Sequence, residues 1–292
     1  MFQGTYTALV TPFEGDHVDA AAFNRHIEGQ IAAGIDGVVP VGTTGESPTL
    51  DHDEHGQVVA LAVKAAAGRC KVIAGTGSNS TSEAISLTRQ AEDAGASAAL
   101  LVAPYYNKPS QEGLYRHYAK IAESTKLPLI LYSIPARCGV EIAVETVARL
   151  ATSCGNIVAI KEAGGTVERV SALRAVLPDS FEILSGDDSL TLPFIAAGAI
   201  GVISVASNIA PKPVGDLVRA ALAGRFDEAR RLHLRYYPLF KDLFLETNPV
   251  PIKHALALAG RMSSDVRLPL CEMSTANAQR LETTLRCLDL IG

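Results

Sequence analysis

The chain has 292 residues, of which 48% are hydrophobic and 20% are charged, so it can bury a sizeable core and is not disordered as a whole. Its 26 Lys and Arg and 31 Asp and Glu give a net charge of −5, and runs of like charge are short, which excludes a basic nucleic-acid arm or membrane patch. Aromatic residues make up 5% and Trp is absent, which favours a core of small aliphatic side chains, as in helix-covered parallel sheets.

Cysteine usage and the N-terminus bear on the cellular compartment. The 5 cysteines include no C-x-x-C pair, so we expect neither a disulfide framework nor a zinc site. The first residues lack the basic segment and the long apolar run of a signal peptide. Residues 189–211 carry no charge, but Pro193, Gly198 and Gly201 interrupt them, which predicts a buried helix, a turn and a buried strand rather than a membrane span. We expect a soluble, reduced, cytoplasmic protein.

Eight short apolar runs predict β-strands. The runs are continuous rather than alternating, as expected for strands that are buried on both faces of a parallel sheet. In chain order they are residues 6–12, 37–42, 71–77, 98–105, 128–135, 157–163, 181–186 and 201–207.

Amphipathic stretches between these runs predict helices. Asp51 and Glu54 have the spacing of a capping box at the start of one helix, and Ser80 and Glu83 predict the same box at the start of the next. Strand and helix alternate eight times at about 28 residues per unit, which predicts an α/β fold of the (β/α)8 TIM-barrel type. The alternative, an open doubly wound sheet, would usually show a Gly-rich turn after the first strand, where this chain has TPF at 11–13.

The remainder of the chain predicts helices alone. After the eighth unit, which ends near residue 224, helical patterns cover residues 226–246, 249–260 and 274–292. No Pro- or Ser-rich linker separates them from the preceding units. We therefore expect a barrel catalytic domain over 1–224 and a C-terminal helical region over 225–292 that packs on the barrel.

A lysine at a strand end is the first candidate for chemistry, because active residues of a (β/α)8 barrel lie at the C-terminal ends of its strands. Lys161 directly follows the apolar residues 157–160. Burial there would lower the pKa of Lys161 and give a neutral amine near neutral pH, which can attack a ketone to form a Schiff base. The alternative is an ordinary strand-end lysine paired with a carboxylate such as Glu162.

Two further strand ends, those of the second and fifth strands, carry three candidate polar groups. Tyr132 could move the protons that imine formation requires, or it could be a core tyrosine with a bonded hydroxyl. Residues 42–45 (GTTG) offer backbone N–H groups and two hydroxyls suited to a carboxylate, although such turns are common. Arg137 could hold a second carboxylate through two hydrogen bonds, or lie on the surface.

These strand ends together resemble a known family. The segments GTTGES at 42–47, PYYNKPSQEGLY at 104–115, LYSIPARCG at 131–139, IKEAGG at 160–165 and SGDDSL at 185–190 occur in this order, followed by NPVPIKHAL at 248–256. The chain resembles, over its full length, the family of pyruvate-dependent class I aldolases and dihydrodipicolinate synthases.

The resemblance implies a lyase of lysine and diaminopimelate biosynthesis that condenses pyruvate with L-aspartate 4-semialdehyde. Lys161 would form the Schiff base with pyruvate. Tyr132, Thr43 and Tyr106 would form a proton relay, in which Tyr106 reaches into the site of a neighbouring subunit. We therefore expect a homo-oligomer, a tetramer built as a dimer of dimers. No metal and no organic cofactor are implied.

The resemblance also implies which residues hold the substrates. Thr44 would bind the pyruvate carboxylate, and Gly186 and Ile203 would line the pocket through their backbones. Arg137 would bind the carboxylate of the semialdehyde at the entrance.

Some positions depart from the family pattern. Ser133 stands where the family often has Asn, and Ala136 and Cys138 flank Arg137 where Ser or Gly and Thr are usual. These changes bear on the second substrate, and two alternatives stay open. One is another pyruvate aldolase, such as N-acetylneuraminate lyase or a 2-keto-3-deoxy sugar acid aldolase, against which Arg137 argues. The other is a silent pyruvate-binding paralogue, against which the intact catalytic residues argue.

A second set of polar residues has three interpretations. His52 and His55 have an i, i+3 spacing that a metal could use, or they face solvent in a first helical turn. The resemblance implies instead a feedback site for lysine, with Pro48 in place of a usual Ala as a change that would alter sensitivity. The residues of that site are Ser47, His52, His55, Asn79, Glu83 and Tyr105.

Overall fold

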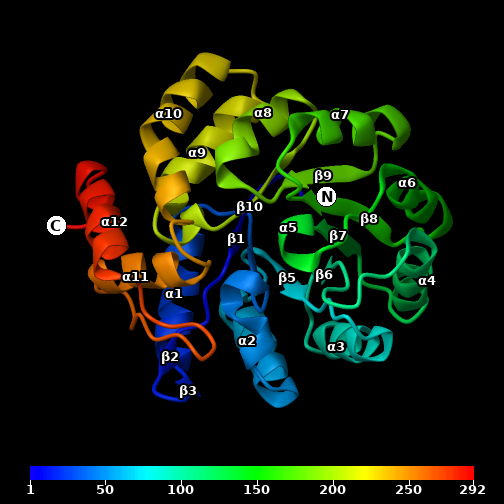
Figure 1. Ribbon diagram of the computed structural model, residues 1–292, viewed down its shortest axis with the longest axis horizontal. Coiled ribbons are helices and arrows are strands. Elements are labelled where there is room, and N and C mark those ends of the chain that lie inside the picture. Colours follow the sequence, from blue (N-terminus) through cyan, green and yellow to red (C-terminus); the bar gives the residue numbers. More distant parts are fainter.

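A closed barrel of eight parallel strands forms the centre of the molecule in the computed structural model, which describes residues 1–292 (Figure 1). The strands follow one another around the barrel in the order β1-β10-β9-β8-β7-β6-β5-β4. They are β1 (Gly4–Ala8), β4 (Gly37–Val39), β5 (Lys71–Gly75), β6 (Ala98–Val102), β7 (Leu129–Ser133), β8 (Ile157–Glu162), β9 (Glu182–Ser185) and β10 (Gly201–Ser204). Each lies within or beside one of the eight apolar runs, so the predicted TIM barrel is confirmed.

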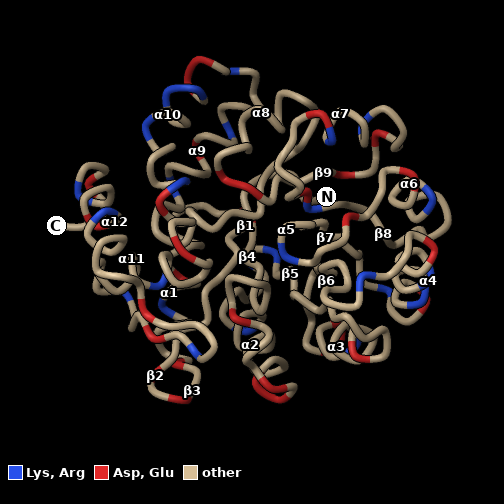
Figure 2. Tube along the Cα trace, in the orientation of Figure 1, with Lys and Arg blue, Asp and Glu red and all other residues tan.

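Helices surround the barrel, and short elements follow several of its strands. The outer helices are α1 (Ala20–Ala32), α2 (His52–Ala66), α3 (Thr81–Asp93), α4 (Gln111–Ala122), α6 (Val144–Ser153), α7 (Val167–Val176), α8 (Thr191–Ala196) and α9 (Pro211–Leu222). The short elements are a hairpin of β2 (Phe13–Glu14) and β3 (His17–Val18), η1 (Thr43–Gly45), η2 (Ser47–Thr49), α5 (Pro135–Cys138), η3 (Asp188–Leu190) and η4 (Ala206–Asn208). Charges of both signs are interspersed along the outer helices (Figure 2).

One of the two predicted capping boxes is present. The Asp51 carboxylate accepts from the Glu54 N–H at 2.8 Å, and the Glu54 carboxylate accepts from the Asp51 N–H at 3.3 Å. The box predicted for Ser80 and Glu83 is wrong, because the Ser80 side chain makes no capping bond. Glu83 instead accepts hydrogen bonds from Ser78 and from His52, a residue of the neighbouring helix.

The uncharged stretch 189–211 contains α8, a turn and β10, as predicted, and η4 follows β10. No helix of the structure combines the length and the apolar character that a membrane span requires.

Three further helices follow the barrel: α10 (Phe226–Asp242), α11 (Val250–Leu258) and α12 (Thr275–Cys287). They lie together on one side of the barrel, in yellow, orange and red in Figure 1. Their apolar faces share one buried cluster with α9 and with the end of β10, to which Val205, Leu239, Ile252 and Leu281 contribute. These helices are therefore packed on the barrel through a continuous hydrophobic core.

A buried ion pair joins these helices to the loop after β4. The Lys253 ammonium of α11 lies 2.5 Å from the Glu46 carboxylate, and the two side chains are 0% and 1% exposed. The other Glu46 oxygen accepts the Arg267 backbone N–H at 3.0 Å. Glu46 has a left-handed φ of 56°. This conformation costs free energy and persists only where surrounding contacts hold it. The ion pair therefore holds the end of the turn that contains Thr43 and Thr44.

We predict that Lys253→Met lowers the free energy of unfolding by about 3–5 kcal/mol, because removal of one partner leaves the Glu46 charge buried and unpaired. Urea unfolding would measure the change. Lys212→Met is the matched control: its ion pair with Asp216 is exposed, so its loss costs less than about 1 kcal/mol. Glu46→Gln combined with Lys253→Met should regain stability over Lys253→Met. Equal stability of Lys253→Met and Lys212→Met would contradict the assigned role.

Candidate active site

A small cavity of about 50 Å³ lies at the carboxyl end of the barrel. It brings together six of the residues that the sequence predicted as catalytic or substrate-binding. They are Thr43, Thr44, Tyr132, Arg137, Lys161 and Gly186. Two lining residues, Phe244 and Asn248, come from the C-terminal helical region.

Lys161 points into the barrel from the end of β8. Side chains alternate along a strand, so Lys161 faces inward, and Glu162 faces the helices, where Arg169 Nε donates to it at 2.7 Å. The alternative pairing of Lys161 with Glu162 is therefore wrong. Lys161 is 6% exposed, and this burial, with a smaller contribution from the Arg137 charge, lowers the pKa of Lys161 to about 7.

Asp188 is the acidic group that acts on Lys161, and sequence analysis gave it no role. Its charge opposes the lowering of the Lys161 pKa. Asp188 is 3% exposed, and this burial raises its own pKa to about 6. The carboxylate accepts from Ser204 Oγ at 2.5 Å and from the Val205 and Ala206 N–H groups at 3.0 and 2.9 Å. Its position after a strand end was the only signal in the sequence.

Tyr132 lies beside Lys161 on the adjacent strand. The two residues are register partners of β7 and β8, and Lys161 Nζ lies 4.2 Å from the centroid of the Tyr132 ring. Burial raises the pKa of Tyr132 to about 12, and the Thr43 side chain is in hydrogen-bonding reach of its hydroxyl. Tyr132 therefore carries a proton at neutral pH and can exchange it with Thr43.

Thr44, Arg137 and Asn248 form a polar wall of the same cavity. The Asn248 side-chain amide donates to Thr44 Oγ1 at 3.0 Å, and Arg137 Nη2 donates to the Asn248 backbone carbonyl at 3.2 Å. Arg137 is an exposed residue that also lines the cavity with Lys161.

Gly186 forms the floor next to Lys161. A Cβ atom at this position would lie 3.0 Å from Lys161 Cε and 2.8 Å from the Ala163 Cβ. Those distances are too short for ordinary contact, so only glycine leaves the Lys161 side chain in place.

Two predicted residues lie outside the cavity. Ile203 is 1% exposed and belongs to the apolar core inside the barrel. Tyr106 is 89% exposed, in the loop after β6. Its φ of 73° is in the left-handed region, which is unusual for a bulky side chain.

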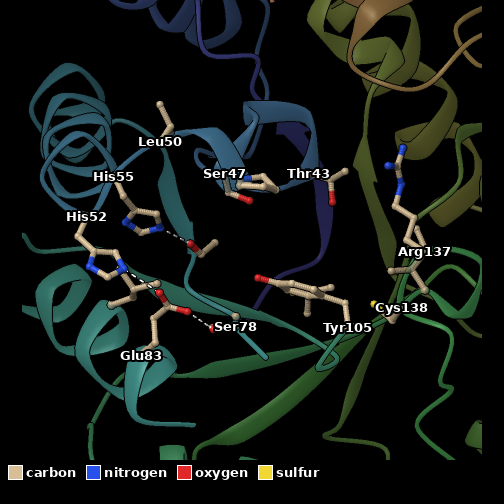
Figure 3. A pocket seen from close by; sticks show the side chains of 16 residues that line it. Thr43, Ser47, Leu50, His52, His55, Ser78, Glu83, Tyr105, Arg137 and Cys138 are labelled. Carbon is tan, nitrogen blue, oxygen red and sulfur yellow. Dashed lines mark hydrogen bonds and ion pairs between the residues drawn. The ribbon is translucent and has the colours of Figure 1, made fainter. Parts of the chain in front are cut away.

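A second cavity of about 330 Å³ adjoins the first and shares Thr43, Ile134 and Arg137 with it. Five of the residues predicted for a lysine site line it: Ser47, His52, His55, Glu83 and Tyr105 (Figure 3). Asn79 is not among the lining residues, and its side chain donates to the Tyr105 carbonyl at 3.2 Å. The sequence gave no signal for Ser78, which also lines this cavity and donates to Glu83.

The two histidines of this cavity have different surroundings. His52 Nε2 lies 2.7 Å from Glu83 Oε1, and hydrogen bonds from Ser78 and His52 lower the pKa of Glu83. His55 is 5% exposed and its Nε2 donates to the Gly75 carbonyl at 2.8 Å, while burial lowers the pKa of His55. The interpretation of both histidines as solvent-facing is therefore wrong for His55. No three His, Cys, Asp or Glu side chains of the structure are grouped to hold a metal.

The chain is similar to known proteins over its whole length. The model of the Dihydrodipicolinate synthetase family matches residues 1–288. The 4-hydroxy-tetrahydrodipicolinate synthase of Geobacter sulfurreducens is 52% identical over 291 residues, which cover 100% of both chains. The solved structure of the same enzyme from Methylacidiphilum fumariolicum SolV is 56% identical, covers 99% of this chain and 96% of that chain, and has a TM-score of 0.98. The dihydrodipicolinate synthase structure from Cyanidioschyzon merolae, with lysine bound, is 40% identical, covers 99% of both chains and has a TM-score of 0.96.

The family model and the alignment with the Geobacter sulfurreducens enzyme, at 52% sequence identity, both extend over nearly the whole chain. The residues that line the Lys161 cavity lie within the matched range. The chain belongs to the dihydrodipicolinate synthetase family.

Proposed function

We propose that this chain condenses pyruvate with L-aspartate 4-semialdehyde to give 4-hydroxy-tetrahydrodipicolinate, a step of lysine and diaminopimelate biosynthesis. The observation that carries the proposal is the buried Lys161, whose pKa is lowered to about 7. It lies in a cavity whose other polar groups suit a small keto acid. Similarity to 4-hydroxy-tetrahydrodipicolinate synthases over the full chain supports the same conclusion.

In this mechanism the neutral Lys161 amine attacks the keto carbon of pyruvate, and water leaves to give the imine. Loss of a methyl proton gives the enamine, whose carbon bonds to the aldehyde carbon of the second substrate while the aldehyde oxygen takes a proton. The amino group of that substrate then attacks the imine carbon, which closes the ring and releases Lys161.

The residues around Lys161 take roles that match their geometry. Tyr132 and Thr43 carry the protons of these steps, because Tyr132 is beside the amine and in reach of Thr43. Thr44 binds the pyruvate carboxylate. Arg137 binds the carboxylate of the semialdehyde, since its guanidinium is fixed at the entrance by the Asn248 carbonyl.

We predict that borohydride reduction in the presence of pyruvate traps a covalent adduct on Lys161, because burial lowers the pKa of this cavity-lining amine to about 7. Mass spectrometry of a digest would place the added mass on the peptide that contains Lys161. Lys161→Ala is the control and should give no adduct. An adduct on a different lysine in the wild-type protein would overturn the mechanism.

The same trapping reaction should depend on pH. The neutral amine becomes more abundant as the pH rises through the Lys161 pKa of about 7, so the trapping rate should rise through that range and then level off. The Arg137 charge contributes to the lowered pKa, so Arg137→Met should move this rise to higher pH. An unchanged pH profile in Arg137→Met would contradict this electrostatic coupling.

Tyr106 is proposed to complete the proton relay of a neighbouring subunit in a tetramer built as a dimer of dimers. Its side chain is 89% exposed, and it does not line the cavity of its own chain. An aromatic side chain held in solvent by a strained backbone is suited to an interface between subunits.

We predict that Tyr106→Phe lowers turnover by about 10²-fold or more, the scale of a lost proton-transfer group. Subunit mixing would test whether Tyr106 acts between chains. A hybrid of Tyr106→Phe and Lys161→Ala subunits should regain activity, because one of its sites combines an intact Lys161 with an intact Tyr106. Sedimentation should show a tetramer, and a fully active monomer would contradict the proposal.

The second cavity is proposed as a site at which lysine inhibits the enzyme. Glu83 is the only carboxylate of its lining and can bind an ammonium group, and hydroxyl and imidazole groups surround it. Thr43 and Arg137 line both cavities, so a bound effector would contact two groups of the active site. The relative from Cyanidioschyzon merolae whose structure has lysine bound supports this assignment.

We predict that lysine inhibits the wild-type enzyme partially, with a coupling free energy of about 1–3 kcal/mol between the two sites. Glu83→Gln should abolish inhibition without loss of activity in the absence of lysine, because it removes the charge that binds the effector at a residue that does not line the Lys161 cavity. Glu123→Gln, at an exposed surface ion pair, is the control and should remain sensitive. A wild-type rate that is unaffected by millimolar lysine would exclude the regulation.

A further inference from the structure

Asn248 reaches the active site from outside the barrel. It precedes α11 in the C-terminal helical region, is 5% exposed, and lines the cavity that contains Lys161. Its side chain has no role in the mechanism proposed above.

The side chain of Asn248 acts on Thr44. Its amide donates to Thr44 Oγ1 at 3.0 Å. A threonine hydroxyl has one proton and two lone pairs. Because one lone pair accepts the Asn248 amide N–H, the Thr44 hydroxyl proton cannot point toward Asn248. Thr44 is 3% exposed, and its hydroxyl donates to no protein group. The proton is therefore free to point into the cavity.

A buried amide that served packing alone would have both its polar atoms satisfied. The Asn248 Oδ1 atom is buried and has no hydrogen-bond partner. The side chain thus leaves an acceptor unpaired, and the bond to Thr44 is its one hydrogen bond to the protein.

We propose that Asn248 is a positioning residue that turns the Thr44 hydroxyl proton toward the carboxylate of pyruvate. This inference rests on the proposed function of Lys161 and Thr44. Asn248 contacts Arg137 through its backbone carbonyl and Thr44 through its side chain. Replacement of the side chain therefore removes the contact with Thr44 and leaves the contact with Arg137. The side chain governs pyruvate binding, and the backbone holds the group that binds the second substrate.

The test compares Asn248→Asp, Asn248→Ala, Thr44→Val and the double variant of Asn248→Asp with Thr44→Val, each with its unfolding midpoint recorded. Aspartate has nearly the same shape as asparagine, but when ionised it only accepts hydrogen bonds and would draw the Thr44 proton to itself. The dependence of borohydride trapping on pyruvate concentration measures pyruvate binding, and steady-state kinetics give KM for both substrates.

We expect Asn248→Asp and Asn248→Ala to raise the pyruvate concentration for half-maximal trapping by about tenfold or more, the scale of a hydrogen bond to a charged group. KM for the semialdehyde should change much less in Asn248→Ala. The double variant should bind pyruvate no more weakly than Thr44→Val, because Asn248 acts through Thr44.

Three results would overturn the inference, and they are distinct from one another. If the wild-type protein traps no pyruvate on Lys161, the proposed function fails and this role of Asn248 fails with it. If the wild-type protein traps pyruvate and folded Asn248→Asp and Asn248→Ala have the same pyruvate dependence, only the role of Asn248 fails. Additive losses in the double variant would likewise show that Asn248 does not act through Thr44.

Discussion

The alternation of side chains along β8 is the constraint on which the site depends. It places the Lys161 amine inside the barrel and the Glu162 carboxylate outside, where Arg169 binds it. If both side chains faced the same way, the carboxylate would stabilise the ammonium form and keep the pKa of Lys161 high. Their separation leaves burial as the largest influence on Lys161, so the strand itself produces a reactive amine.

The barrel supplies most of the cavity, and the C-terminal helices fix its polar wall. Lys253 binds Glu46, directly after the Thr43–Gly45 turn, and Asn248 contacts Thr44 and Arg137, which follow different strands. Loops at strand ends are free to vary in position, whereas contacts from a packed helical layer hold them in one arrangement. The helices after the barrel therefore serve the geometry of the site as well as the core.

Two neighbouring cavities share a wall that contains Thr43 and Arg137. Thr43 is in reach of Tyr132 on one side, and the group around Glu83 lies on the other. A ligand in the second cavity would therefore influence the first through side chains in direct contact. Transmission over so short a distance requires no large movement of the barrel.

Local patterns in the sequence determined the strands, the helices and the candidate lysine. Continuous apolar runs predicted all eight strands, and the Asp51–Glu54 box was correct because no distant group competes for its hydrogen bonds at Asp51, whereas Glu83 is bound by Ser78 and His52. Strand-end positions identified five of the six predicted residues that the structure brings into one cavity, and the resemblance to a family added Gly186 and the roles of all six. Contacts between distant segments were decided only by tertiary structure. Glu83 binds His52 of the neighbouring helix instead of capping its own helix, and Asp188 binds Ser204 at the end of β10. Asn248 binds Thr44, which is 204 positions away in the sequence. Spacing along the chain carries no information about such pairs, because closure of the barrel and packing of the last helices bring them together.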